Sequence, residues 1–268
     1  MEIKEKLALL QEQLLSMQSV MVAYSGGVDS SLLLKVAYDT LGDRAVAVTA
    51  VSEVTATGEA ADAEAFAKKI GAKHLIIETE ELLDDRFAAN PAERCYYCKQ
   101  ELFTKLQSLA VTQQLKHIIY GANADDLGDH RPGMKAAKDM QIRAPLLEAG
   151  LTKMEIRLLA KELDLPNWDR PALACLASRF PYGTRITKQN LAMVDQAEFF
   201  LRSIGFGQLR VRHHGGIARL ELLAEDFAKA VELREAIIVH LKQLGYKYIA
   251  LDLQGFRSGS MNEVLSDR

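Results

Sequence analysis

The sequence is poor in cysteine, in aromatic residues and in long runs of any one kind. Its 268 residues include three cysteines and one tryptophan, and aromatic residues make up 7%. An odd number of cysteines argues against a disulfide framework. No run of about 18 uncharged apolar residues occurs, so we expect no membrane span. Residues 1–6 are charged and lack the apolar core of a signal peptide, so we expect a cytoplasmic protein.

The chain also lacks a strongly basic character. Its formal net charge is −3 and no long basic run is present, which argues against a nucleic-acid partner. Apolar residues make up 49% of the sequence, enough for a sizeable core. A chain of 268 residues can form one large domain or two small ones. We therefore expect neither a nucleic-acid nor a membrane partner.

The first two-thirds of the chain alternate strand-like and helix-like segments. The expected strands are residues 20–23, 45–51, 74–79, 117–120 and a short fifth segment, 142–146. The expected helices begin near residue 32 and cover 59–70, 98–115 and 152–163. Such alternation is typical of the α/β class with a doubly wound parallel sheet. Ligands bind at the carboxyl ends of such strands, so the loops after Tyr24, Val51 and Tyr120 should share one crevice.

The pattern changes at residues 166–184, which carry three prolines, the single tryptophan and one cysteine. We expect a long ordered loop there, and such loops are often functional. A small α+β domain should follow. Its expected elements are a helix at 189–204, hairpin strands at 208–214 and 217–222, a helix at 226–244 and a strand at 248–253. We expect one domain over residues 1–182 and a second over 183–268.

The most informative stretch is Ala23-Tyr24-Ser25-Gly26-Gly27-Val28-Asp29-Ser30-Ser31, between an expected strand and an expected helix. Its glycines let the backbone approach an anion, and the free N–H groups at a helix start point toward it. Asp29 beside phosphates calls for a bridging cation such as Mg²⁺. The alternative is a tight turn without a ligand. The stretch lacks the motifs of a Walker A loop and of a dinucleotide fold, and it resembles the PP-loop of the ATP pyrophosphatases.

A second candidate segment, Gly121 to Asp126, follows the expected strand 117–120. Its acids should lie at the same sheet edge as the glycine-rich stretch, where a nucleotide–metal complex would bind. Arg131 could hold a phosphate or a carboxylate with a bidentate guanidinium. The alternatives are solvated loop acids and an arginine that merely flanks Pro132 at the start of a helix.

The cysteines form another candidate site. Cys95 and Cys98 have C-x-x-C spacing, and Cys175 lies in the long loop. They could be small buried residues, or a redox pair with a separate Cys175. They could also ligate one metal centre: three thiolates can hold an iron–sulfur cluster with one open iron, whereas structural zinc takes four ligands. Cys175 is also a candidate nucleophile or sulfur source.

Arginines mark the expected small domain. Arg210 and Arg212 alternate along an expected strand and should share a face, where they could clamp a phosphate or two carboxylates. The alternative is a solvated strand face. Arg257 lies in the glycine-flanked turn 255–262 and suggests a further anion contact.

Together these motifs resemble the LarE family of ATP-dependent sulfur transferases over nearly the whole chain. The matching segments are the PP-loop, residues 131–133, Cys175 with residues 178–183, residues 210–212 and residues 251–259. The resemblance implies that residues 25–30 bind the pyrophosphate of ATP–Mg²⁺ and that Cys175 handles the sulfur. The nucleotide and substrate ligands expected from the motifs and the resemblance are Ala23, Ser25, Gly26, Gly27, Asp29, Ser30, Gly121, Asp126, Arg131, Ser178, Arg210, Arg212 and Arg257. Cys175 and Asp29 are the expected catalytic residues.

The resemblance also implies a substrate and a sulfur route. Members of the family thiolate pyridinium-3,5-biscarboxylic acid mononucleotide, for the nickel-pincer nucleotide of lactate racemase, and form homo-oligomers, often hexamers. In one variant a single cysteine donates its own sulfur and becomes dehydroalanine. In the other, three cysteines hold a [4Fe–4S] cluster that carries an extra sulfide. Because Cys95 and Cys98 are present, the chain is similar to the second variant, with Cys95, Cys98 and Cys175 as implied cluster ligands.

Three other functions stay open on the sequence alone. A tRNA thiolase would share the loop and the cysteines but should carry a basic RNA-binding face. An amide-forming ligase would use the same loop without needing three cysteines. A nucleotide sensor with a structural metal would bind the nucleotide without cleaving it.

Overall fold

The computed structural model describes residues 1–128, 131–171 and 174–257. The sequence motifs at residues 129–130, 172–173 and 258–262 lie outside these ranges. The chain divides into two compact units. Unit 1 comprises Met1–Ser52, Gly58–Asp84 and Glu93–Leu173, and unit 2 comprises Glu53–Thr57, Asp85–Ala92 and Ala174–Arg268. A functional division at residue 182 stays a prediction.

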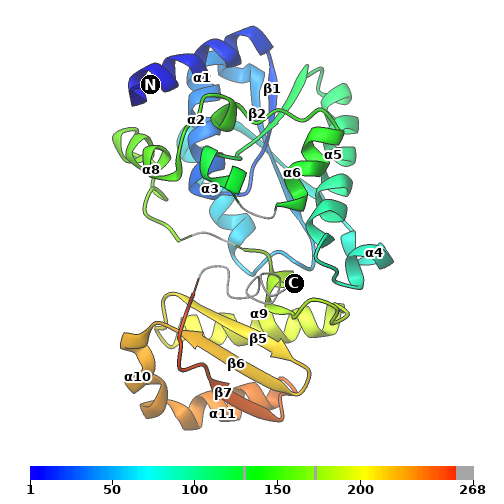
Figure 1. Cartoon of the computed structure of the whole chain (residues 1–268), viewed down its shortest axis with the longest axis vertical. Helices are drawn as coiled ribbons and strands as arrows, with labels where there is room; N and C mark the ends of the chain where they lie inside the picture. Colours follow the sequence, from blue (N-terminus) through cyan, green and yellow to red (C-terminus); the bar gives the residue numbers. More distant parts are fainter. Residues whose placement is uncertain (129–130, 172–173, 258–268) are drawn as a thin grey trace. The chain divides into compact units, whose positions relative to one another are not determined.

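Unit 1 is built on a four-stranded parallel sheet with the order β3-β2-β1-β4. Its strands are β1 (Val20–Ala23), β2 (Ala45–Val51), β3 (Lys73–Glu78) and β4 (His117–Tyr120). Ala23, the last residue of β1, pairs with Val48 on one side and Tyr120 on the other. The loops that leave β1 and β4 therefore start next to each other, at the carboxyl edge of the sheet (Figure 1).

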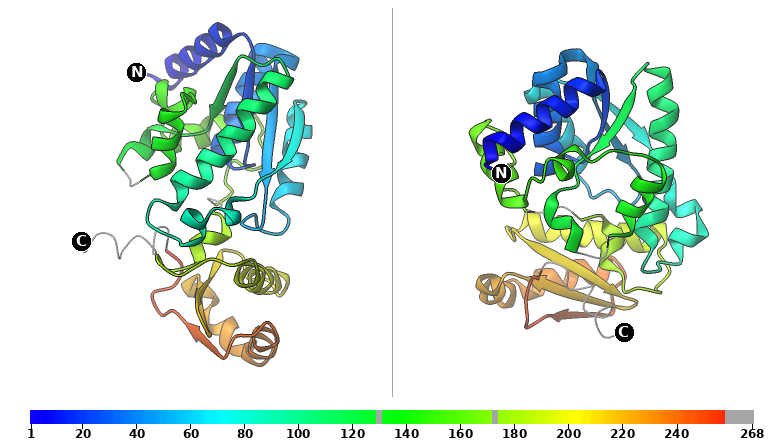
Figure 2. Two further views of the ribbon diagram at one scale, coloured as in Figure 1. Left: turned by 90° about the vertical axis from the view of Figure 1, so that its right-hand side faces the viewer. Right: turned by 45° about the horizontal axis from the view of Figure 1, so that its top comes forward.

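Helices cover both faces of this sheet (Figure 2). The helices of unit 1 are α1 (Ile3–Met17), α2 (Val28–Leu41), α3 (Glu59–Ile70), α5 (Arg94–Thr112), α6 (Pro132–Asp139), α7 (Pro145–Glu148) and α8 (Lys153–Glu162). Its 3-10 turns are η1 (Gly42–Arg44), η2 (Glu81–Leu83) and η3 (Ala124–Gly128). Val20 and Val22 join the core under α1, α2 and α8, whereas Met21 joins the core under α5. Alternate residues of β1 thus bury opposite faces, as expected of a doubly covered parallel strand.

Unit 2 is a smaller α+β unit with a three-stranded sheet of order β5-β6-β7. Its strands are β5 (Leu209–His214), β6 (Ile217–Leu222) and β7 (Tyr248–Leu251). Its helices are α4 (Asp85–Ala88), α9 (Lys188–Ser203), α10 (Phe227–Glu232) and α11 (Arg234–Gln243), with 3-10 turns η4 (Leu176–Arg179) and η5 (Ala224–Asp226). Strands β5 and β6 form an antiparallel hairpin, and β7 adds parallel to β6. A separate core joins α9, α11 and this sheet.

The structure confirms the expected doubly wound parallel sheet and the small α+β unit. Several local signals are also confirmed. Gly71 ends α3 with φ of 90°, a conformation that glycine adopts at little cost. Thr152 forms a capping box with Glu155 at the start of α8. In the described part of the chain, no helix combines the length and the apolar character needed to cross a membrane.

Two expected elements are wrong. Residues 142–146 form no strand; a single parallel bridge joins Ile119 and Arg143, and Pro145 then begins α7. Proline lacks an N–H for a sheet ladder but suits the first turn of a helix.

The helix expected at 226–244 is two helices, because Leu233 leaves the helical conformation between α10 and α11. Its apolar side chain packs on the core, so the hydrophobic pattern runs through the break unchanged.

Candidate functional site

The loop of residues 24–30, called the PP-loop below, joins β1 to α2 and is shaped to bind an anion. Gly26 has φ of 73° and Gly27 is the N-cap of α2. The first helical bond runs from Ser31 N to the carbonyl of Gly27. Among the described residues, no acceptor lies in hydrogen-bond geometry to the N–H groups of Val28, Asp29 or Ser30. These donors, at the positive end of the helix dipole, remain available to a ligand.

The serines of the PP-loop brace it from within. Ser30 Oγ donates to the carbonyl of Gly27 at 3.0 Å and lies 3.2 Å from Ser25 Oγ. Tyr24 OH lies 3.1 Å from Ser31 Oγ, and Thr49 Oγ1 donates to the carbonyl of Tyr24 at 2.8 Å. The hydroxyl of Ser30 therefore fixes the turn, while its backbone N–H has no acceptor among the described residues.

Asp29 meets a cation that the sequence did not indicate. Its carboxylate forms an ion pair with Lys153 Nζ, and Asn123 Nδ2 donates to it at 3.4 Å. Lys153 is the first residue of α8, and its backbone N–H donates to Asp125 at 2.9 Å. The sequence predicted the start of this helix from its capping box, but not the direction of the lysine. Asp29 fits as one oxygen ligand for Mg²⁺, and Lys153 adds a second positive charge for phosphate.

The segment after β4 packs directly against the PP-loop. A Cβ on Gly121 would lie 2.9 Å from Ser30 N, so this position needs a glycine for close approach. Asp126 is buried, accepts from Asn123 N at 3.0 Å and pairs with Arg131 at 2.9 Å. The structure thus brings this segment to the sheet edge where the sequence placed it.

Unit 2 holds a second polar cluster, around a buried ion pair. Arg179 donates from Nε and Nη2 to the two carboxylate oxygens of Glu198, each at 2.8 Å, and both side chains are almost fully buried. Arg202 and the N–H of Val211 also donate to Glu198. Burial alone would raise the pKa of Glu198, but these hydrogen bonds and charges hold that pKa below its usual value.

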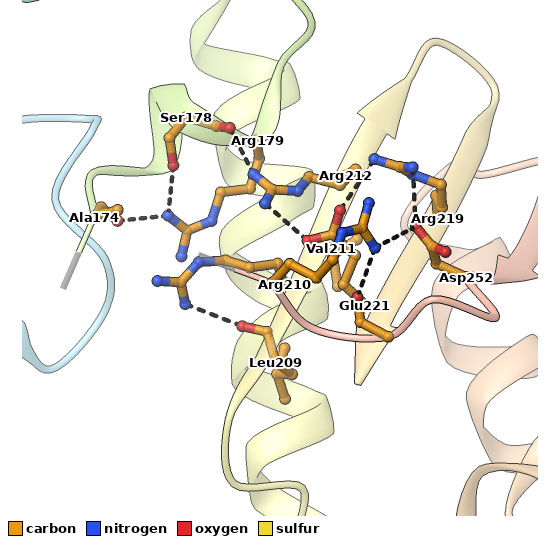
Figure 3. Close-up of polar contacts among 12 residues, drawn as sticks. Ala174, Ser178, Arg179, Leu209, Arg210, Val211, Arg212, Arg219, Glu221 and Asp252 are labelled. Atoms are coloured by element: carbon orange, nitrogen blue, oxygen red, sulfur yellow. Dashed lines mark hydrogen bonds and ion pairs between the residues drawn. The ribbon is translucent and has the colours of Figure 1, made fainter. Parts of the chain in front are cut away.

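This ion pair fixes the segment that carries Cys175. Arg179 Nη1 donates to the carbonyl of Cys175 and to Ser178 Oγ, both at 3.0 Å, and to the carbonyl of Ala174 at 2.5 Å (Figure 3). Cys175 itself is exposed. An exposed thiol on a segment whose backbone carbonyls are held by a buried arginine suits a nucleophile or a sulfur-handling residue. No motif or spacing in the sequence indicates the pairing of Arg179 with Glu198.

The two arginines expected to clamp an anion lie on β5, but their face is not solvated. Arg212 is 4% exposed, pairs with Glu221 at 2.7 Å and donates to the carbonyl of Ser178 at 2.8 Å (Figure 3). Arg210 lies over the ring of Phe256, 5.3 Å from its centroid. Burial, followed by the positive charge of Arg179, lowers the pKa of Arg210 to about 10. Such a group is stabilised by an added anion.

Two further arginines, Arg219 and Arg257, lie beside Asp252. Arg219, on β6, pairs with Glu221 at 3.0 Å and with Asp252 at 2.9 Å. Arg257 Nη1 lies 4.0 Å from Asp252 and donates to the carbonyl of Gly255 at 3.3 Å. Within residues 174–257 the cluster has twice as many cationic as acidic members: Arg179, Arg202, Arg210, Arg212, Arg219 and Arg257 against Glu198, Glu221 and Asp252.

The cysteines belong to different units. Cys95 and Cys98 lie one turn apart near the start of α5 in unit 1, and Cys175 lies in unit 2. Residues one turn apart share a helix face, so two thiols can meet one metal. Over residues 1–128, 131–171 and 174–257, no group of three or more Cys, His, Asp or Glu side chains is arranged to hold a metal ion. A three-cysteine site therefore stays a prediction.

A parallel sheet with an open helix start after its first strand defines an α/β protein with a nucleotide-type anion site. Comparison with known proteins narrows this class. The chain matches the asparagine synthase family over residues 8–251. It is 44% identical over 267 residues to an uncharacterized protein of Synechocystis sp., covering 98% of this chain and 99% of that one.

A further relative is the pyridinium-3,5-bisthiocarboxylic acid mononucleotide synthase of Lactiplantibacillus plantarum. The identity is 40% over 262 residues, which covers 97% of this chain and 95% of that enzyme. A Methanocaldococcus jannaschii protein is 30% identical over 90% of this chain and 92% of its own. The chain therefore belongs to the LarE family of PP-loop proteins. This membership supports an ATP-dependent enzyme.

We expect Gly121→Ala to weaken nucleotide binding, because the new methyl group would push against Ser30 N in the PP-loop. The dissociation constant for ATP, measured by isothermal titration calorimetry, should rise about tenfold or more, equivalent to about 1.4 kcal/mol. Gly207→Ala is the matched control, because a Cβ there meets no atom within 4 Å. Equal affinity of wild type and Gly121→Ala would contradict this view of the site.

We expect Glu198 to make the protein sensitive to acid. Its folded pKa lies below the ordinary value of 4.5, so its contribution to stability is present above that pH and is lost as the pH falls through the folded pKa. Glu198→Gln should lower the free energy of unfolding at pH 7 by about 3–5 kcal/mol, because it leaves Arg179 buried without its counter-charge. Urea unfolding at pH 7, 5 and 4 should show a flatter pH dependence for the variant. Parallel profiles would contradict the assignment.

Proposed function

We propose that this protein is an ATP-dependent sulfur transferase that converts carboxylates of pyridinium-3,5-biscarboxylic acid mononucleotide to thiocarboxylates. The observation that carries the proposal is the row of available N–H groups at the start of α2, opposite Gly121 and beside Lys153. It occurs in a chain that is 40% identical to a synthase whose name gives a bisthiocarboxylic acid mononucleotide as product. Such a product requires a substrate with two carboxylates to activate and one phosphate to bind.

The first half of the proposed reaction takes place at the PP-loop. An oxygen of the substrate carboxylate attacks the α-phosphorus of ATP, and the bond to the pyrophosphate breaks. The products are an acyl adenylate and pyrophosphate. The N–H groups of Val28, Asp29 and Ser30 and the ammonium of Lys153 hold the negative charge that develops on the leaving group. Mg²⁺, bound through Asp29, would neutralise part of the same charge.

The second half transfers sulfur. A sulfur nucleophile attacks the carbonyl carbon of the acyl adenylate, the bond to the phosphate oxygen breaks, and AMP leaves. If the nucleophile is Sγ of Cys175, a thioester forms; loss of the Cα proton and cleavage of the Cβ–Sγ bond then release the thiocarboxylate and leave dehydroalanine. If the nucleophile is sulfide, Cys175 stays intact. The hydrogen bonds from Arg179 to the carbonyl of Cys175 hold this segment in place.

The arginine cluster of unit 2 supports a phosphate-bearing substrate. Arginine outnumbers the acids there, and burial, followed by repulsion from Arg179, lowers the pKa of Arg210. A bound phosphate would relieve this repulsion and accept hydrogen bonds in the forked geometry that guanidinium groups provide. We assign Arg210, Arg212, Arg257 and Ser178 to this role.

The sulfur route is the part of the proposal that distinguishes this chain. Cys95, Cys98 and Cys175 together provide the thiolate donor set of a [4Fe–4S] cluster. When bound, such a cluster would supply an open iron that holds an exchangeable sulfide. The pair on α5 fits as two ligands one turn apart. A homo-oligomer, expected from the resemblance, also stays a prediction.

We expect the two half-reactions to separate on substitution. With ATP, Mg²⁺, sulfide and the pyridinium substrate, wild type should release AMP and pyrophosphate only when that substrate is present. Cys175→Ala should still form the acyl adenylate once, with pyrophosphate released, but yield no thiocarboxylate by mass spectrometry. Lys153→Ala should lower the rates of pyrophosphate release and of thiocarboxylate formation about tenfold or more, because it removes a positive charge beside the leaving group. Pyrophosphate release without the substrate, or with tRNA in its place, would point to another function.

We expect purification without oxygen to reveal the sulfur route. Wild type should contain about four irons and four sulfides per chain with a broad visible absorption, and Cys95→Ala should lose them. Mass spectrometry after turnover should show intact Cys175. Absence of iron, together with conversion of Cys175 to dehydroalanine, would instead establish the sacrificial route.

A further inference from the structure

A buried asparagine behind the PP-loop, Asn167, has no role in the chemistry described above. It lies in the segment that follows α8 and is 1% exposed. Its Nδ2 donates to the carbonyl of Gly26 at 2.7 Å and to Ser31 Oγ at 2.8 Å. Both acceptors belong to the strand-to-helix junction, 141 and 136 residues earlier in the chain. The buried side chain of Asn167 therefore contacts the junction between the PP-loop and α2 from the interior of unit 1.

The orientation of this amide follows from chemistry. The carbonyl of Gly26 can only accept, so the nitrogen of Asn167 must face it. As a result Asn167 Oδ1 is buried without a hydrogen-bond partner among the described residues. A buried acceptor left without a partner lowers stability. An asparagine kept here at that cost points to a role in shaping the loop.

The consequence for the anion site lies in the carbonyl of Gly26. In a helix extended by one residue, this carbonyl would accept from the N–H of Ser30, four positions later. Asn167 takes this acceptor, and Ser30 N–H has no other among the described residues. On its other side Gly26 packs against Ala63, which would lie 3.1 Å from an added Cβ. The turn is thus held between α3 and Asn167, and the N–H of Ser30 has no acceptor among the described residues.

The segment that carries Asn167 is itself anchored. Arg157, on α8, donates to the carbonyls of Trp168 and Arg170 at 3.0 and 2.9 Å. Arg170 in turn pairs with Asp62 on α3 at 2.5 Å and lies over the ring of Phe66. The amide of Asn167 therefore acts from a fixed position.

We propose that Asn167 is a positioning residue that holds the carbonyl of Gly26 away from the anion site and keeps the N–H of Ser30 free for the pyrophosphate end of ATP. The proposal rests on the proposed use of ATP and assigns one part of that ligand. Asn167 touches the loop that would hold pyrophosphate, so its loss should affect pyrophosphate far more than AMP.

The test compares the binding of pyrophosphate and of AMP, each with Mg²⁺, by isothermal titration calorimetry on the full chain. Asn167→Leu removes the donor with little change of volume, and Asn167→Asp keeps the shape but turns an acceptor toward Gly26. Either variant that folds serves the test. Asn90→Asp is the matched control, because Asn90 is also buried and its amide donates to the carbonyls of Phe180 and Pro181, in unit 2. Melting curves check the fold of each variant.

Both Asn167 variants should bind pyrophosphate about tenfold more weakly or worse, with the AMP affinity changed less than about twofold. Asn90→Asp should bind both ligands as wild type does. Unchanged pyrophosphate affinity, or equal losses for both ligands, would overturn the role of Asn167 and leave the proposed use of ATP intact. Wild type that binds neither ligand would overturn both proposals.

Discussion

The candidate site depends on a row of backbone N–H groups at the start of α2 that have no acceptor among the described residues. Four neighbours pack around this helix start. Gly121 lets the segment after β4 approach Ser30, and Lys153 forms an ion pair with Asp29. Ala63 and Asn167 fix Gly26 from two sides. Each neighbour comes from a different segment of the chain, and the doubly wound sheet brings these segments together at its carboxyl edge.

Unit 2 contains buried ion pairs between arginines and carboxylates. It buries Arg179 and Arg212 by giving each a fully buried carboxylate, Glu198 and Glu221, which also contact further arginines. Buried pairs of this kind add little net stability but fix side-chain positions. The arginines outnumber the acids, and the pKa of Arg210 is lowered by burial and, after it, by the positive charge of Arg179. The cluster therefore holds the segment that carries Cys175 through the hydrogen bonds of Arg179.

The sequence predicted most of the fold because its signals are local. The glycine turn after β1, the capping box of Thr152 and the apolar runs of the strands lie within a few residues of what they control. The predicted strand at 142–146 and the single helix at 226–244 were wrong. Pro145 begins a helix, and the break at Leu233 lies at a residue that still packs on the core, so the hydrophobic pattern does not record it.

The sequence by itself determined the strand–loop–helix motif, the acids after β4 and the positions of the three cysteines, since these follow from residue type and spacing. Only the tertiary structure decided which groups meet them. Lys153 contacts Asp29 across 124 residues, and Asn167 reaches Gly26 across 141. Glu198 reaches Arg179 from α9, the next helix, and nothing in the spacing marks the two as partners. Hydrogen bonds and ion pairs depend on direction and on burial, and both are set when distant segments pack together.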